Sequence, residues 1–233
     1  MPTAEPQPAA PWQVPIRDDL AYILPMGTFL LLVQAGITWP ALYPAAYVAR
    51  TLLAALLLVW LWPKYTRIRW NGWYIGALLG VVGVLQWVLM QHWLQRHFAL
   101  FRPDPDTVFD PTRHFTSAAA RRAFIGVRIA GASLVVPVME ELFWRDFAWR
   151  TIAAPNDFKL ATIGERDWRA FVIVPLIFAA VHGHACLTAI VWAFMIGGLL
   201  AWARSLGACI IMHAVTNLLL GLYVLHSREW AFW

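Results

Sequence analysis

The chain has 233 residues, of which 61% are hydrophobic and only 13% are charged. Soluble domains are about 45–50% apolar and about 25% charged, so the composition excludes an ordinary soluble domain and predicts an integral membrane protein. The net charge of +5 comes from basic residues in short gaps between apolar runs, a pattern typical of membrane topology signals and not of nucleic-acid binding.

The N-terminal residues are rich in proline and alanine and lack the basic start and apolar core of a signal peptide. Residues 1–19 are therefore predicted to be a flexible tail, and residues 20–233 a single transmembrane domain. A membrane-crossing helix needs about 20 mostly apolar residues. The candidate segments are 20–38, 41–62, 72–91, 122–150, 170–184, 186–203 and 207–226.

The predicted fold class is all-α, a polytopic membrane helix bundle of about seven to eight transmembrane helices with a polar cavity inside the membrane. Helices are expected because backbone groups in lipid must satisfy their own hydrogen bonds. Segment 122–150 is longer than one span requires. It holds either one kinked helix or a span plus a short surface helix, and Pro137 is the expected kink.

The distribution of basic residues predicts the orientation. Side A is defined as the side of the N-terminal tail. It receives Arg17, Lys64, Arg67, Arg69, Arg145, Arg150, Lys159, Arg166, Arg169 and Arg204. Side B receives the smaller set Arg96, Arg102, Arg113, Arg121, Arg122 and Arg228. Cytoplasmic loops carry the excess of lysine and arginine, so side A is predicted to be cytoplasmic.

The stretch PVMEELFWRDF places charged residues where a membrane helix is expected. Ionisable groups inside spans are costly and mark functional sites. Glu141 and Arg145 are four residues apart, so they share a helix face and can form an ion pair. Glu140 lies about 100° around the helix from Glu141 and is left without that partner.

Two later helices carry the same spacing. Phe178 and His182 are four residues apart, and so are His213 and Asn217. At about 1.5 Å per residue, their polar groups and Glu140 lie at a similar depth below side A. We therefore expect these groups to meet in one buried cavity that opens toward that side.

His184 follows Gly183 at an expected helix break. This position predicts that His184 either lies at the membrane interface or supports the site by contacting the residues that bind a substrate. The two cysteines, Cys186 and Cys209, lie in apolar stretches and form no CxxC motif, so they indicate neither a disulfide framework nor a metal site.

The predicted cluster fits the chemistry of acyl-bond hydrolysis. A carboxylate in a low-dielectric site can act as a general base, and a nearby histidine can help to orient and deprotonate water. A histidine and an amide one helical turn apart supply hydrogen-bond donors for an oxyanion. The favoured bond is a peptide bond, and the sequence has no GxSxG or HExxH motif.

Three motifs carry a family resemblance. EELFWR, FAAVH and HAVTN are similar to the EExxxR, FxxxH and HxxxN motifs of the CPBP intramembrane protease family, also called the Abi or CAAX-protease family. Their order and spacing also match, and the resemblance covers about residues 120–226.

The resemblance implies a glutamic intramembrane endopeptidase without a metal or another cofactor, whose catalytic cavity opens to the cytosol. Glu140 would activate water with help from His182. His213 and Asn217 would stabilise the oxyanion. Structural support of the site would come from Glu141, Arg145 and Phe178.

The chain is also similar to bacterial members of this family that accompany exosortase and PEP-CTERM sorting systems. This similarity implies a multi-pass protein of the bacterial inner membrane, with a sorting-system partner. The expected substrate is a membrane protein or peptide within the lipid bilayer, and no nucleic acid is expected.

Two alternatives stay open at the level of sequence. In the first, Glu140, His182 and His213, with His184 nearby, are ligands of a zinc-dependent membrane protease. In the second, the polar cluster is a binding pocket or structural network of a non-catalytic membrane scaffold or immunity protein.

Overall fold

The structure is a computed structural model, which describes residues 16–233. Most of the predicted tail, residues 1–15, lies outside the described residues. The first helix begins at Asp18, slightly before the predicted boundary at residue 20. The main helices are α1 (Asp18–Thr38), α2 (Tyr43–Trp60), α3 (Trp73–His97), α5 (Ala118–Ala130), α6 (Val136–Glu141), α7 (Trp149–Ala153), α8 (Trp168–Ala180), α9 (Cys186–Ala203) and α10 (Leu206–Ser227).

The predicted fold class is confirmed. Within residues 16–233 there is no β-strand, and six helices are long and apolar enough to cross a membrane. This number is slightly below the predicted seven to eight. The difference lies at α8, which was expected to cover 170–184 but has only 13 residues. At about 1.5 Å per residue, α8 is roughly 20 Å long, shorter than the hydrocarbon core of about 30 Å.

The long fourth segment is one continuous helical rod, Ala118–Ala153, and not a span followed by a separate surface helix. Two π-helical segments, η5 (Gly131–Val135) and η6 (Leu142–Ala148), join α5, α6 and α7. Pro137 lies near the start of α6, directly after η5, and the helix does not end there. π-Helical turns inside α-helices are frequent at functional sites, and here they flank Glu140 and Glu141.

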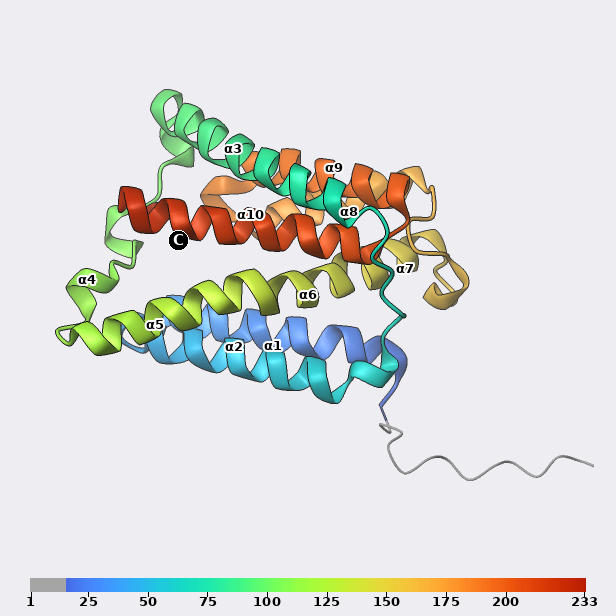
Figure 1. Cartoon of the computed structure of the whole chain (residues 1–233), viewed down its shortest axis with the longest axis horizontal. Coiled ribbons are helices and arrows are strands. Elements are labelled where there is room, and N and C mark those ends of the chain that lie inside the picture. The colour runs from blue at the N-terminus through green and yellow to red at the C-terminus, as the bar shows by residue number, and fades with distance from the viewer. Residues whose placement is uncertain (1–15) are drawn as a thin grey trace, which may run out of the picture.

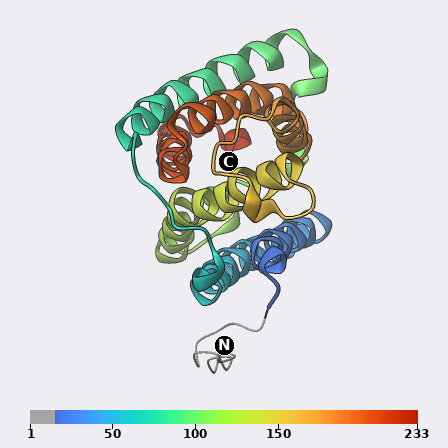
Figure 2. The same cartoon turned by 90° about the vertical axis from the view of Figure 1, so that its right-hand side faces the viewer.

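The helices form a layered bundle with the long rod and α10 at its centre. Figure 1 shows α1 and α2 on one side of the rod, and α10, α3, α8 and α9 on the other. Figure 2, in which the right-hand end of Figure 1 faces the viewer, shows the same succession of layers. The rod and α10, which carry two of the three motifs, therefore lie at the centre of the bundle. The third motif-bearing helix, α8, lies on the side of the rod opposite α1 and α2.

Glycines on one face of α3 allow close contact with its neighbours in the bundle. A Cβ atom at Gly76 would overlap the carbonyl oxygen of Ala208, and one at Gly80 would lie 2.8 Å from the carbonyl oxygen of Met212. Small residues at such spacing let membrane helices approach closely. The close approach of α3 fixes α10, which carries His213, in the bundle.

Gly76→Ala is expected to lower the free energy of unfolding by about 1–3 kcal/mol, because the added methyl group overpacks a backbone contact. The matched control is Gly126→Ala in α5, where a Cβ meets nothing within 4 Å and helix propensity favours alanine by up to about 1 kcal/mol. Thermal unfolding of both proteins in detergent measures the difference. Equal midpoints would contradict the close α3–α10 contact.

Candidate active site

The centre of the bundle holds a buried ion pair that the sequence predicted. Arg145 Nη1 donates to Glu141 Oε1 at 3.0 Å, and both side chains are at most 1% exposed. The same oxygen accepts a hydrogen bond from His213 Nδ1 at 2.7 Å. The pairing of Glu141 with Arg145 is therefore confirmed. The His213 contact adds a link between the long rod and α10 that spacing along one helix could not reveal.

Glu140 lies beside this cluster but does not belong to its hydrogen-bond network. The residue as a whole is half-buried, and its side chain has no hydrogen bond or ion pair within residues 16–233. The charged or titratable groups that act on it electrostatically are His213, Glu141 and Arg145. Glu140 thus has no hydrogen-bonded or ion-pair partner in the described part of the chain, as the spacing argument expected, and His213 lies within electrostatic range of it.

His182 is fixed by the helix that precedes it. Its Nδ1 donates to the Phe178 carbonyl oxygen at 2.7 Å, and the two rings are 4.3 Å apart. Because Nδ1 carries this hydrogen bond, Nε2 is the nitrogen available to another group. The Phe178 ring also lies 5.0 Å from the Arg145 guanidinium, so it packs between the His182 ring and the ion pair.

A small cavity of about 40 Å³ brings three of the predicted residues together: His182, His213 and Asn217 all line it. A water molecule needs roughly 10–15 Å³ of such volume, so the cavity can hold water. Glu140 is not among the lining residues, and an electrostatic interaction with His213 is what links it to this wall.

Asn217 makes a contact with the π-helical segment. Its Nδ2 donates to the carbonyl oxygen of Ala132, within η5, at 2.8 Å. An amide nitrogen has two donors, so one of them remains for another group. His184 does not line the cavity, and its carbonyl oxygen accepts a hydrogen bond from Gln91 at 3.4 Å. The helix break predicted before His184 is confirmed by the end of α8 and by the positive φ of Gly183.

Two atoms of the ion pair are buried without a hydrogen-bond partner in the described part of the chain: Glu141 Oε2 and Arg145 Nη2. Buried polar atoms are nearly always hydrogen-bonded, to protein or to water. These two atoms therefore favour a bound water molecule or another polar group next to the ion pair, which suits a site that handles water.

The zinc hypothesis requires a cluster of metal ligands. Catalytic zinc usually takes three protein ligands, which would be Glu140, His182 and His213. Among residues 16–233 no group of three or more His, Cys, Asp or Glu side chains is placed to hold a metal ion.

The sequence analysis missed four residues in the wall of the cavity, Trp87, Trp192, Thr216 and Leu220. Trp192 stacks on Phe178 at 5.6 Å, lies 4.8 Å from the His213 ring, and donates from Nε1 to Thr216 Oγ1 at 3.3 Å. Thr216 directly precedes Asn217, which was the available signal. Trp192 is one of fifteen tryptophans, so nothing in the sequence distinguished it.

A second buried ion pair, Asp146 with Arg150, was also missed. Arg150 was expected among the side A loop cations, but it is only 5% exposed and forms a short hydrogen bond with Asp146, which is 0% exposed. Asp146 also accepts from Tyr22 in α1 at 3.0 Å and from Thr66 at 3.2 Å. The i,i+4 spacing was the signal, and the network fixes the rod to α1 and to the loop before α3.

Tyr22→Phe is expected to lower the free energy of unfolding by about 1.5–3 kcal/mol, because it removes a hydrogen bond to a buried carboxylate. Tyr74→Phe is the matched control, since Tyr74 is 59% exposed. Chemical denaturation of both proteins in mixed micelles measures the change. A loss of stability in the control as large as in Tyr22→Phe would contradict this role for Asp146.

Fold and site together define a class: a polytopic helical membrane protein whose core holds a buried acid, arginine and histidine cluster. Residues 123–219 match the family model described as type II CAAX prenyl endopeptidase Rce1-like. The resemblance to the CPBP family is therefore confirmed, over the part of the chain that carries all three motifs. The protein is an integral membrane protein, and its link to bacterial sorting systems stays a prediction. No curated protein and no solved structure matches the chain.

Proposed function

We propose that this protein is an intramembrane endopeptidase that hydrolyses a peptide bond of a membrane-associated protein or peptide. The observation that supports the proposal is the small cavity that His182, His213 and Asn217 line together, with Glu140 within electrostatic range of His213. The family match over residues 123–219 supports the same class of reaction.

Glu140 acts as the general base in this proposal, with help from His182. Its carboxylate has no partner among residues 16–233 and can accept a proton from water. His182 donates from Nδ1 to the Phe178 carbonyl oxygen, so its Nε2 can accept a hydrogen bond from the same water. The resulting hydroxide attacks the carbonyl carbon of the substrate and forms a tetrahedral oxyanion.

His213 and Asn217 stabilise that oxyanion. Glu141 accepts from His213 Nδ1, which orients the ring, and in the imidazolium form of His213 the Nε2–H donates to the oxyanion. The amide of Asn217 supplies a second donor. When the intermediate collapses, the C–N bond breaks and the proton held by Glu140 passes to the leaving amine. The products are a carboxylic acid and an amine.

Substrate trapping tests the proposal. Cells that express the wild-type chain, Glu140→Gln or the control Glu165→Gln are compared by quantitative proteomics of membrane proteins and their new termini. Glu165 lies in a loop, where its carboxylate accepts hydrogen bonds from Thr162, and glutamine keeps an acceptor there. We expect uncleaved substrates to accumulate only with Glu140→Gln. Equal processing by all three proteins would contradict the proposed function.

A further inference from the structure

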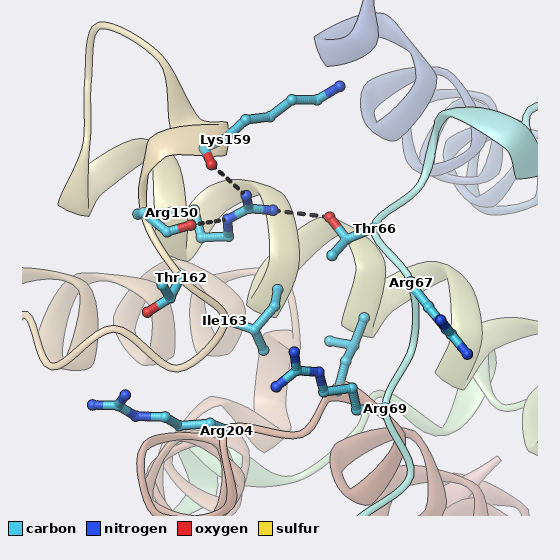
Figure 3. Close-up of a pocket in the computed structure, with 10 residues that line it drawn as sticks. Thr66, Arg67, Arg69, Arg150, Lys159, Thr162, Ile163 and Arg204 are labelled. Carbon is cyan, nitrogen blue, oxygen red and sulfur yellow. Dashed lines mark hydrogen bonds between the residues drawn. The ribbon is translucent and has the colours of Figure 1, made fainter.

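A basic pocket of about 450 Å³ lies at the end of the bundle where α1 and α3 begin and α2 and α9 end. This end faces the viewer in Figure 2, and Figure 3 shows the pocket in close-up. Arg150, in its wall, follows Glu140 by ten residues along the rod, which is roughly 15 Å at about 1.5 Å per residue. The cationic residues in its wall are Arg67, Arg69, Arg150, Lys159 and Arg204.

Two of these cations are already used within the protein. Arg150 pairs with Asp146 and donates to the carbonyl oxygens of Lys159 and Ala161. The ammonium of Lys159 pairs with Asp18 at the start of α1. Figure 3 shows the hydrogen bonds of Arg150 to its neighbours in the wall. These two residues therefore build the pocket and contribute little free positive charge to it.

The other three arginines carry the unbalanced charge. The side chains of Arg67, Arg69 and Arg204 are exposed and have no hydrogen bond or ion pair within residues 16–233. Glu165, which interacts electrostatically with Arg204, accepts from the Thr162 hydroxyl at 2.6 Å. This hydrogen bond lowers the pKa of Glu165, so its carboxylate stays charged and offsets part of the Arg204 charge. Arg67 and Arg69 have no such offset.

The loops that carry these arginines are fixed in place. The carbonyl oxygen of Arg69 accepts hydrogen bonds from Gly207 N at 2.9 Å and from Ser205 Oγ at 2.8 Å. Asn71 donates to the carbonyl oxygen of Ala203 at 2.8 Å. The loop before α3 is thereby held against the turn between α9 and α10. Because these donors are already held in place, less conformational entropy is lost when an anion binds.

Exposed tryptophans mark the membrane level of this end. Trp62, Trp70, Trp168 and Trp202 are 50–76% exposed and lie at or beside the ends of α2, α3, α8 and α9. Tryptophan is enriched where the membrane meets water. The pocket therefore lies at the depth of the lipid headgroups.

We propose that the basic pocket binds the phosphate group of an anionic lipid headgroup. Arginine forks match the geometry of phosphate oxygens and remain charged at any physiological pH, and the tryptophans place the pocket where such phosphates lie. The proposal rests on the membrane fold and not on the proposed peptidase activity. A soluble phosphate has the same chemistry, so the test must separate the two sources.

Native mass spectrometry of the full chain in neutral detergent tests the proposal, with phosphatidylglycerol and phosphatidylcholine as probes. The variant is Arg67→Gln/Arg69→Gln. The matched control, Arg96→Gln/Arg122→Gln, removes the same charge from exposed arginines at the opposite end. We expect the variant to bind phosphatidylglycerol about 10- to 30-fold more weakly than the wild type. The control should keep the wild-type affinity and preference.

Three results would overturn the proposal. Unchanged binding by the Arg67→Gln/Arg69→Gln variant would show that the pocket is not the site. An equal loss in the control would show that the attraction is diffuse. The third result is that millimolar inorganic phosphate displaces phosphatidylglycerol and that the Arg67→Gln/Arg69→Gln variant weakens phosphate binding to the same extent. This result would assign the pocket to a soluble anion. Circular dichroism of each protein checks that the fold is retained.

Discussion

Glu140→Gln is expected to lower kcat/KM for peptide cleavage by about 10²- to 10⁴-fold, the usual contribution of a general base. Glutamine has nearly the same shape but cannot accept a proton from water. The unfolding midpoint should change little, because Glu140 makes no side-chain hydrogen bond or ion pair within residues 16–233. Cleavage of a trapped substrate by purified protein in detergent measures the activity.

Glu140→Asp is the matched control for this prediction. Aspartate keeps the base but withdraws it by about one carbon–carbon bond, so activity between those of the wild type and Glu140→Gln is expected. The non-catalytic scaffold hypothesis predicts no cleavage by any of these proteins. A Glu140→Gln protein with wild-type kcat/KM would show that another group activates the water.

Spacing along single helices predicted much of the candidate site. The pairs Glu141–Arg145 and His213–Asn217 each share a helix face because a turn has about 3.6 residues. Phe178 and His182 were expected to do the same, but His182 lies just beyond the end of α8 and contacts Phe178 through its Nδ1 hydrogen bond. Glu141, Arg145, Phe178 and His213 are buried, whereas His182 and Asn217 are partly exposed. The ion pair of Glu141 with Arg145 was readable because both partners lie on one helix.

Contacts between distant parts of the chain could not be predicted in the same way. His213 binds Glu141 across 72 residues, and Tyr22 binds Asp146 across 124 residues. A single sequence carries no signal for such pairings. The π-helical segments were also invisible, since each wide turn changes the angular position of the residues after it, although the apolar pattern continues.

Hydropathy also hid the end of α8. The apolar run continues through Val181, but the backbone leaves the helix after Ala180, and Gly183 adopts a positive φ of 51°. The segment was therefore predicted to reach residue 184. The end of the helix turns the backbone at His182, where the imidazole stays fixed by the Phe178 carbonyl oxygen, and Gly183 permits the turn because it has no Cβ.

Glu141→Leu is expected to lower the free energy of unfolding by about 3–5 kcal/mol, because removing one partner of a buried ion pair leaves the other charge uncompensated. Arg145 is only 1% exposed and would lose its carboxylate partner. Arg113→Ala is the control, since it breaks an ion pair in which the arginine is 89% exposed, and little change is expected there.

The double variant Glu141→Leu/Arg145→Met separates charge from packing. It removes both charges of the buried ion pair, so it should recover a large part of the stability lost in Glu141→Leu. Its activity should stay low, because His213 would lose the carboxylate that accepts from Nδ1 at 2.7 Å. Denaturation in mixed micelles and cleavage of the same substrate measure both quantities. If the double variant were as unstable as Glu141→Leu, the loss would come from packing around Glu141 and not from an unpaired charge.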